Sequence, residues 1–362
     1  MIKTDCIWKE NWAAARQHHI DWWEHKGLVL WLTAPKDSPW EKVPAPAEPR
    51  DLEERWFDAE YRTRRAEYDL SRVYFGGDSF PLAGSYAGAG DLAAYLGSPI
   101  RLSPETVWYD PCIADPPERH PPLRLDRSGA VYRKAVALAD RMVAVSGGRF
   151  LVTPPDIVEN IDILSAMRGP QTLLMDMVDR PAWVEERVAQ INAAFFEVFD
   201  AFYRKTRDEN DGSTFVFNLW GPGKTCKVQC DACSMFSPAM FARFVLPALT
   251  EQCEWLDYAM YHLDGEDCLP HLDLLLGIEP LQAIEWTPRY ISRGEDGGQP
   301  KFYDLYRRIL RGGKSVQAIG VKYDDVIPLL DAVGAKGMFI TTSAQSEAAA
   351  RRLEERVRAY RR

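Results

Sequence analysis

An acid- and histidine-rich segment, residues 261–273, is the part of this chain best equipped for chemistry. Its sequence is YHLDGEDCLPHLD, with two of the six histidines of the chain, four acids and a cysteine. It follows an apolar run at residues 258–261 that predicts a strand, and α/β proteins place reactive groups directly after their strands. Imidazole, carboxylate and thiol groups together indicate a metal site or an acid–base site. The structural alternative is a helix start, with Asp267 as its cap and Pro270 in its first turn.

Apolar runs elsewhere in the chain predict the elements that must position these groups. Eight strands are expected, each followed by a helix. They are expected at residues 28–33, 73–76, 150–153, 214–219, 258–262, 281–286, 315–319 and 337–341. This alternation predicts an α/β fold with a parallel sheet. Eight units in 362 residues favour a closed (β/α)₈ TIM barrel over an open doubly wound sheet, and no glycine-rich nucleotide motif follows any strand.

The domain organisation follows from this count of units. Residues 1–362 are expected to form a single barrel domain. Residues 1–27 are expected to be an N-terminal helical extension. The Gly- and Pro-rich residues 80–127 are expected to be a long loop insertion after the second strand. Long irregular insertions in otherwise regular chains are more often functional than not.

Composition and charge narrow the classes of partner. The net charge is −9, from 53 acidic and 44 basic residues, without a basic stripe, which argues against nucleic acid. No run of about 18 apolar residues is present, so no membrane-spanning segment is expected. The N-terminus lacks the apolar core of a signal peptide, and the seven cysteines are an odd number. A reduced, cytoplasmic protein without disulfide bonds is therefore expected.

The ends of the expected strands supply the candidate site residues, because barrel enzymes bind and react there. The predicted catalytic residues are His262, Asp264, Asp231 and Asp78. The predicted substrate-binding residues are Trp220, Lys224, Glu266, Trp286, Asp156 and Asn160. The cation in the GPGK loop suits an anion beside free backbone N–H groups, and the indoles suit the walls of a pocket. The structural alternatives are helix caps for the carboxylates, a turn for the lysine and core packing for the tryptophans.

Three cysteines form a second pattern, with C-x₃-C-x₂-C spacing at Cys226, Cys230 and Cys233. This spacing matches the loop that ligates a [4Fe–4S] cluster in radical S-adenosylmethionine enzymes. In those enzymes the loop follows the first strand, whereas here it lies past the middle of the chain, without a glycine-rich cofactor site nearby. A zinc site that combines some of these thiols with His262 is a less specified alternative. We favour small buried residues, the usual use of free cysteine.

Residues 235–247, MFSPAMFARFVLP, resemble the SPxxFxxFxxP helix of the uroporphyrinogen decarboxylase (URO-D) superfamily, and so does the preceding Asp231. The sequence YHLDG at 261–265 lies where those proteins carry a strand-end histidine followed by glycine. The resemblance covers most of the chain and is strongest from about 214 to 342. It implies a single (β/α)₈ barrel, in a superfamily of decarboxylases and of zinc-dependent methyltransferases that act with corrinoid proteins.

The chain also departs from both branches of that superfamily. The first expected strand is followed by Ala34-Pro35-Lys36 and not by the arginines that bind porphyrinogen, and Asp78 resembles the catalytic aspartate only by its place. The zinc methyltransferases carry His-x-Cys and a later cysteine. Here Asp264 follows His262 and the last expected strand ends in residues 341–343, TTS. The resemblance therefore implies a divergent branch near the corrinoid methyltransferases, with zinc on His262 and Asp264 as the metal to test.

Four functions remain open on this sequence. Demethylation of a small molecule, with transfer of the methyl group to a corrinoid partner protein, is preferred. The alternatives are a decarboxylase or lyase acting on a non-porphyrin acid, a carbohydrate-acting enzyme with paired carboxylates, and a non-catalytic binding protein. A homodimer is left open. An enzyme predicts an open cavity that contains His262, Asp264 and Asp231.

Overall fold

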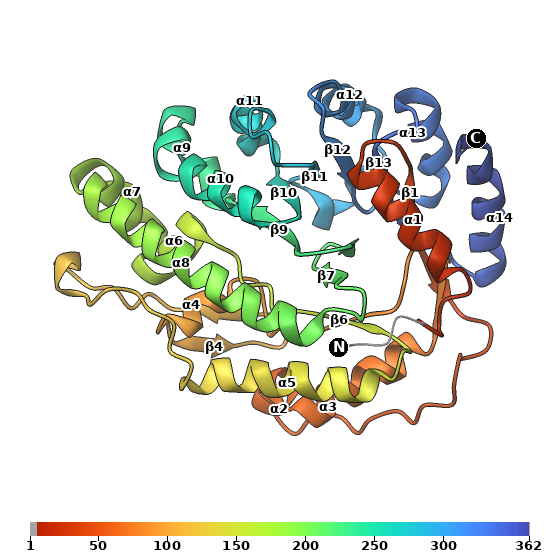
Figure 1. Ribbon diagram of the computed structural model, residues 1–362, viewed down its shortest axis with the longest axis horizontal. Helices are drawn as coiled ribbons and strands as arrows, with labels where there is room; N and C mark the ends of the chain where they lie inside the picture. Colours follow the sequence, from red (N-terminus) through yellow and green to blue (C-terminus); the bar gives the residue numbers. More distant parts are fainter. Residues whose placement is uncertain (1–5, 362) are drawn as a thin grey trace.

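A mostly parallel sheet of seven strands lies at the centre of the structure, a computed structural model that describes residues 6–361 (Figure 1). The strand order is β2-β1-β13-β12-β11-β10-β9. These strands are β1 (Val29–Pro35), β2 (Val73–Gly77), β9 (Thr225–Gln229), β10 (Tyr258–Asp264), β11 (Ala283–Thr287), β12 (Ser315–Ala318) and β13 (Met338–Ser343). All neighbours pair in parallel except β2, which is antiparallel to β1. The predicted α/β class is confirmed.

Helices lie around the outside of this sheet (Figure 1). They are α1 (Trp12–Trp23), α2 (Leu52–Phe57), α3 (Ala59–Leu70), α4 (Asp91–Tyr95), α5 (Ala130–Ser146), α6 (Asn160–Arg168), α7 (Pro170–Asp179), α8 (Pro181–Thr206), α9 (Pro238–Phe244), α10 (Leu246–Trp255), α11 (Leu272–Leu276), α12 (Tyr303–Arg311), α13 (Val326–Val333) and α14 (Glu347–Val357). Helix α9 begins as its sequence predicts, with Pro238 in the first turn and the Ser237 hydroxyl accepting from the Met240 N–H. No helix within residues 6–361 has the length and apolar character needed to cross a membrane.

Two short strand pairs lie beside the seven-stranded sheet. Strand β3 (Leu82–Gly84) pairs in parallel with β6 (Leu151–Thr153), and β7 (Ser213–Phe215) pairs with β8 (Leu219–Gly221) as a hairpin. The hydroxyl of Thr214 donates to the Val152 carbonyl at 3.1 Å, which joins β7 to β6. Across the described residues no continuous ladder links these pairs to the sheet, so the strands follow the course of a barrel without closing one.

The strand expected at residues 214–219 is wrong. The chain reverses there, because Phe217 and Asn218 both adopt left-handed backbone angles with φ of 63°. The parallel strand of this unit is β9, in a stretch expected to be a loop. Its inward-facing Lys227 and Gln229 interrupt the apolar pattern that normally marks a buried strand.

The expected insertion at residues 80–127 contains regular structure. It holds β3, α4, the hairpin β4 (Ile100–Leu102) and β5 (Val107–Tyr109), and the 3₁₀ helix η1 (Pro117–Arg119). Strand β2 is antiparallel to β1, so it cannot be the parallel strand expected for this unit. Strand β3, which pairs in parallel with β6, takes that place. The expected loop character of this stretch is therefore corrected, whereas its treatment as an insertion in a single domain stays a prediction.

Helix α1 covers the amino-terminal end of the sheet. The Trp22 indole donates to the carbonyls of Val316 and Gly337, where β12 and β13 begin, at 3.3 and 3.2 Å. The Trp23 indole donates to the Trp220 carbonyl at 2.9 Å. Of the helical extension expected at residues 1–27, residues 12–23 form α1, and residues 1–5 lie outside the described part of the chain. Helix α1 leaves the carboxyl-terminal strand ends as the accessible end of the sheet.

Candidate active site

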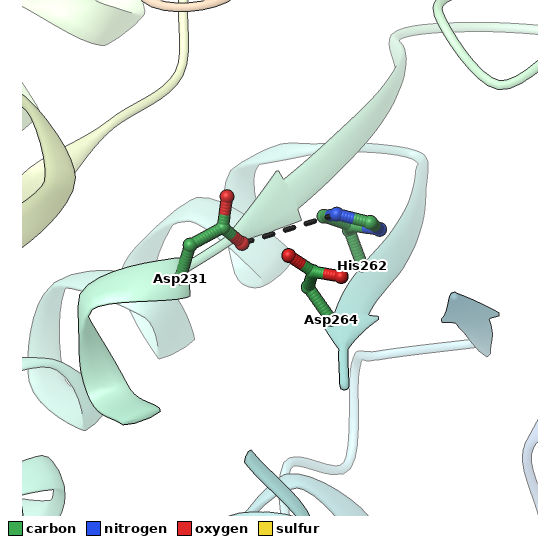
Figure 2. Close-up of side chains that lie close together, drawn as sticks. All are labelled: Asp231, His262 and Asp264. Carbon is green, nitrogen blue, oxygen red and sulfur yellow. Dashed lines mark ion pairs between the residues drawn. The ribbon is translucent and has the colours of Figure 1, made fainter. Parts of the chain in front are cut away.

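Three polar side chains converge at the carboxyl-terminal ends of β9 and β10 (Figure 2). Asp231 is the first residue of the 3₁₀ helix η2 (Asp231–Met235), and His262 and Asp264 belong to β10. One ligand atom from each of the three lies within 4.8 Å of the others. The His262 Nε2 is 3.9 Å from the Asp231 Oδ1. Glycine follows Asp264 with a φ of 76°, a backbone angle that suits glycine and turns the chain away from the site.

The His262 ring is held from two sides. Its Nδ1 hydrogen-bonds the fully buried carboxylate of Glu285 on β11, which also accepts from the Thr287 hydroxyl at 2.8 Å. The Phe217 ring at the hairpin tip lies 4.6 Å from the imidazole. We assign the hydrogen to Nδ1, because an ionised carboxylate only accepts. The Nε2 is then the atom that faces Asp231 and Asp264.

A buried polar network fixes Asp231. The Gln229 side-chain amide donates to the Asp231 Oδ2 at 2.9 Å and to Asp162 at 3.1 Å, and its oxygen accepts from the Lys227 ammonium. The Asp162 carboxylate also accepts the Asp231 N–H at 2.8 Å. Asp231 therefore has its backbone and one oxygen bound, while its Oδ1 has no hydrogen-bond partner.

The electrostatics of the site follow from its unequal numbers of acids and cations. Burial and the neighbouring Asp162 raise the pKa of Asp231 to about 7, against the opposing effect of His262. Burial alone would lower the pKa of His262, but the Glu285 carboxylate overcomes it and raises the pKa to about 9. Burial also raises the pKa of Glu159 to about 8, even though Lys227 is nearby. This end of the sheet has an excess of carboxylates that a cation would stabilise.

Two further predicted residues lie at the same end. The Asp156 Oδ1 accepts from the Lys227 ammonium at 2.9 Å and so joins the network. Glu266 begins the 3₁₀ helix η3 (Glu266–His271) two residues after Asp264, and its Oε2 is buried without a hydrogen-bond partner. Asn160 is not brought to the site. It starts α6 and donates to Gln252 of α10 at 3.2 Å, in a buried contact between helices.

Asp78 lies at the opposite end of the sheet from His262. Because β2 is antiparallel, its last residue precedes a turn at the amino-terminal end of β1, where the Leu30 N–H donates to the Asp78 Oδ2 at 2.7 Å. Its other partners are His18 of α1, at 2.6 Å, and Arg361. The expectation that Asp78 joins the His262 site assumed a parallel strand and is corrected here.

Trp220 and Lys224 are also at the amino-terminal end, because both precede β9. The Trp220 ring packs in the core 5.7 Å from that of Trp12, and the Lys224 ammonium lies 3.9 Å above the Trp255 ring. Trp286 is fully buried between the sheet and the helices, 5.3 Å from Phe302. Successive side chains of a strand point to opposite faces, and the preceding residue, Glu285, points towards His262. None of the three lines the site, which corrects the expectation that they bind substrate.

The three cysteines of the C-x₃-C-x₂-C pattern do not converge. Cys226 is the second residue of β9 and Cys230 directly follows the strand, so the two are four residues or ~13 Å apart along the extended chain. All three are buried, and burial raises the pKa of Cys230 to about 12. Cys233 contacts Cys230 and also Cys268. A three-thiolate cluster is excluded by this geometry, which agrees with the interpretation as small buried residues.

The residues that the sequence interpretation missed share one signal. They are polar residues buried within strands: Lys227 and Gln229 in β9, and Glu285 in β11. A buried charge has to be paired. Glu285, in the otherwise apolar strand Ala283–Thr287, could therefore have indicated a partner for His262. Phe217 gave no such signal, because its contact with His262 depends on the reversal of the chain at residues 217 and 218.

Two cavities open at this end of the sheet. One, of about 390 Å³, reaches Asp231, Gln229 and Asp162 from the insertion, which contributes Gly90 and Tyr109. The other, of about 790 Å³, lies beyond Asn218, at the ends of β12 and β13. The predicted open cavity thus reaches Asp231, but neither His262 nor Asp264 lines it.

Comparisons with known proteins give a fold and no family. No protein-family model matches the sequence, and no curated protein sequence matches it. Among solved structures, a methyltransferase from Methanosarcina mazei is similar with a TM-score of 0.58 and 8% sequence identity, over 95% of this chain and 99% of that chain. At such low identity the likeness shows a shared fold, extending over nearly the whole of both chains.

Proposed function

We propose that this protein is an enzyme that transfers a methyl group from a small molecule, assisted by a divalent metal ion on Asp231, His262 and Asp264. The proposal is carried by the three ligand atoms within 4.8 Å of one another. Three protein ligands with one position left for water or substrate is the pattern of catalytic zinc. A histidine ligand usually has its second nitrogen bound to a carboxylate, as Glu285 is bound here. The donor set therefore fits a zinc ion.

The reaction we propose breaks the bond between the methyl carbon and a substrate heteroatom. The heteroatom keeps the electron pair of that bond, and the methyl group passes to a nucleophile with its own electron pair, which we propose to be a corrinoid carried by a partner protein. A bound metal ion would supply Lewis acidity at the heteroatom. Gln229 and Asp162 hold Asp231 in place, and the Phe217 ring shields one face of His262 from water.

The fold shared with a solved methyltransferase supports this choice over the other functions that the sequence leaves open. Membership in a divergent branch of the uroporphyrinogen decarboxylase superfamily, a single domain, a complete (β/α)₈ barrel and a cytoplasmic location belong to the same proposal. The order of β1 and β9 to β13, with β3 and β6 beside them, supports the barrel.

Zinc binding tests the proposal directly. Full-length protein freed of metal with a chelator is titrated with zinc in competition with a chromogenic chelator. We expect one equivalent to bind, and the affinity to fall at least ten-fold in Asp264→Asn. The control is Asp273→Asn, in the same segment but 80% exposed and paired with Arg308. Absence of stoichiometric binding, or an equal loss in both variants, would remove the metal from the proposal.

A second candidate is metal-free acid–base chemistry of the lyase or decarboxylase type. It is favoured by the Asp231 pKa of about 7 beside His262, a value suited to a general acid or base at neutral pH. Full activity of the chelator-treated enzyme would select this candidate.

A further inference from the structure

We infer that the larger cavity at the carboxyl-terminal end of the sheet binds an oxyanion, a carboxylate or phosphate carried by an organic ligand. Its volume of about 790 Å³ is within the about 300–1,000 Å³ usual for small-molecule sites. It is formed by the loops after β12 and β13, by the start of α14 and by the hairpin tip at Asn218. It shares no lining residue with the cavity at Asp231.

Arg352 provides the positive charge of this cavity. It lies on α14, is exposed, and has no hydrogen bond or ion pair to any residue among 6–361. Its neighbour Arg351, by contrast, is bound to both Glu10 and Glu347. An arginine kept free above a cavity in a chain of net charge −9 is suited to bind an oxyanion through two parallel N–H bonds.

The other charged groups of the cavity are one lysine and one acid. The Lys322 ammonium is 2.9 Å from the Asp296 carboxylate and 3.3 Å from the Gly294 carbonyl, so its charge is already largely neutralised. Asp324 is the acid in the lining. Arg352 is therefore the group on which the affinity for an anion depends most.

A buried hydroxyl gives independent evidence for a ligand. Thr342 lines the cavity and is only 7% exposed, yet its Oγ1 has no hydrogen-bond partner. The adjacent Thr341 hydroxyl, which also lines the cavity, accepts from the Gly320 N–H at 2.8 Å. An unpaired buried hydroxyl is unfavourable, and an oxygen of the ligand would satisfy it.

The hairpin tip connects this cavity to His262. Phe217 contacts the imidazole, while the next residue, Asn218, lines the cavity. The tip is held by the Gln317 side-chain amide, which donates to the Phe217 carbonyl at 2.8 Å. An organic substrate anchored by its anionic group in this cavity would have to reach past the hairpin tip to the proposed metal site. This last step rests on the proposed function, whereas binding of the anion does not.

Calorimetric titration of the full-length protein with inorganic phosphate, and separately with acetate, tests the inference. We expect saturable binding that weakens about ten-fold or more in Arg352→Gln, the loss of one charge-assisted hydrogen-bond pair. Thr342→Val should weaken it about three-fold, because a single neutral hydrogen bond is lost. The control Arg356→Gln removes the same charge from α14 outside the lining and should change nothing. Tighter binding of phosphate than of acetate would identify a phosphate ester, and comparable binding a carboxylate.

Two results would overturn the inference: no saturable binding of either probe, or an equal loss of affinity in Arg352→Gln and Arg356→Gln. The readout needs no catalysis and no metal. Asp264→Asn, which should lose zinc, should keep its affinity for the anion. Failure of the anion site and failure of the metal site are therefore separate results.

Discussion

The two ends of the sheet each pair a histidine with an aspartate, and they differ in how completely the pair is satisfied. At the amino-terminal end, Asp78 is fully buried under α1 and both of its oxygens are bonded, to His18, Arg361 and the Leu30 N–H. At the carboxyl-terminal end, the Asp231 Oδ1 has no hydrogen bond and faces His262. The same residue types are therefore fully paired at one end of the sheet, whereas at the other end they leave one atom free for the proposed chemistry.

The pKa values of the two aspartates move in opposite directions because their charged neighbours differ. Burial alone would raise both, but hydrogen bonding from His18 and the charge of Arg361 lower the pKa of Asp78. At Asp231 the neighbouring Asp162 adds to burial, and the pKa rises. A perturbed carboxyl pKa does not by itself mark a functional site, since structural ion pairs such as that of Asp78 also perturb it.

The largest expected effect comes from breaking the amino-terminal pair. Asp78→Asn leaves Arg361 without its buried partner and should lower the free energy of unfolding by about 3–5 kcal/mol in urea denaturation. Asp231→Asn, which removes an oxygen without a hydrogen-bond partner, should cost less than about 1 kcal/mol. A smaller loss in Asp78→Asn than in Asp231→Asn would contradict the comparison.

The two ends should also fail at opposite pH extremes in the metal-free protein. The pKa of His262 is raised to about 9 from 6.5, so its contribution is complete below pH 6.5 and is lost as the pH rises through 9. That contribution is up to about 3 kcal/mol. The pKa of Asp78 is lowered, so its contribution is present above pH 3.8 and is lost as the pH falls through the folded-state value.

Unfolding free energies measured from about pH 2 to pH 10 check this, because that range covers both the acid loss below pH 3.8 and the alkaline loss through pH 9. The alkaline loss should shrink in Glu285→Gln, which removes the charge that raises the His262 pKa. A pH profile for this variant that superimposes on that of the parent protein would show that the pair does not titrate as described.

A smaller effect is expected on metal binding when the orientation of His262 is disturbed. Glu285→Gln keeps the shape of the side chain but weakens the hydrogen bond to Nδ1, and zinc affinity should fall about 10–100-fold. Asp78→Asn is the matched control at the other end and should leave zinc affinity unchanged. The measurement is the same chelator competition, and equal affinities in Glu285→Gln and the parent protein would argue against His262 as a ligand.

The smallest effect is expected at Lys224, which sequence reasoning placed in the site. Lys224→Gln removes a cation–π contact with Trp255 and should cost about 0.5–1 kcal/mol of stability. Zinc and phosphate affinities should not change, because the residue lies at the amino-terminal end of β9. A loss of either affinity would place this end of the sheet in the binding machinery after all.

Two neighbouring strands, β10 and β9, differ in how well the sequence predicts them. Strand β10 was predicted almost to its bounds, since it is apolar up to His262 and a polar turn follows it, and His262 and Asp264 lie at its end as expected. Strand β9 was missed and the 214–219 hairpin was mistaken for it. The periodicity of that hairpin is that of a strand, and its reversal depends on two left-handed residues that no pattern marks.

The residues wrongly expected at the His262 site were misplaced because the direction of their strands was not known. Asp78, Trp220 and Lys224 follow extended segments, as a barrel site requires, but those segments are antiparallel to their neighbours or precede the true strand. A sequence carries the tendency to be extended, which is local. It does not carry the direction in which the segment pairs, which depends on partners far away in the chain.

The sequence by itself determined the alternation of strand and helix, the α/β class and the placement of His262 and Asp264 at the end of a strand. These depend on hydrophobic period and capping, which act over a few residues. Only the tertiary structure decided that Glu285 and Phe217 hold the imidazole of His262. It also decided that Asp78 lies at the amino-terminal end of the sheet, under α1, and that Arg352 and Thr342 line one cavity. Those facts depend on contacts between distant segments, where burial and pairing are settled by the whole fold.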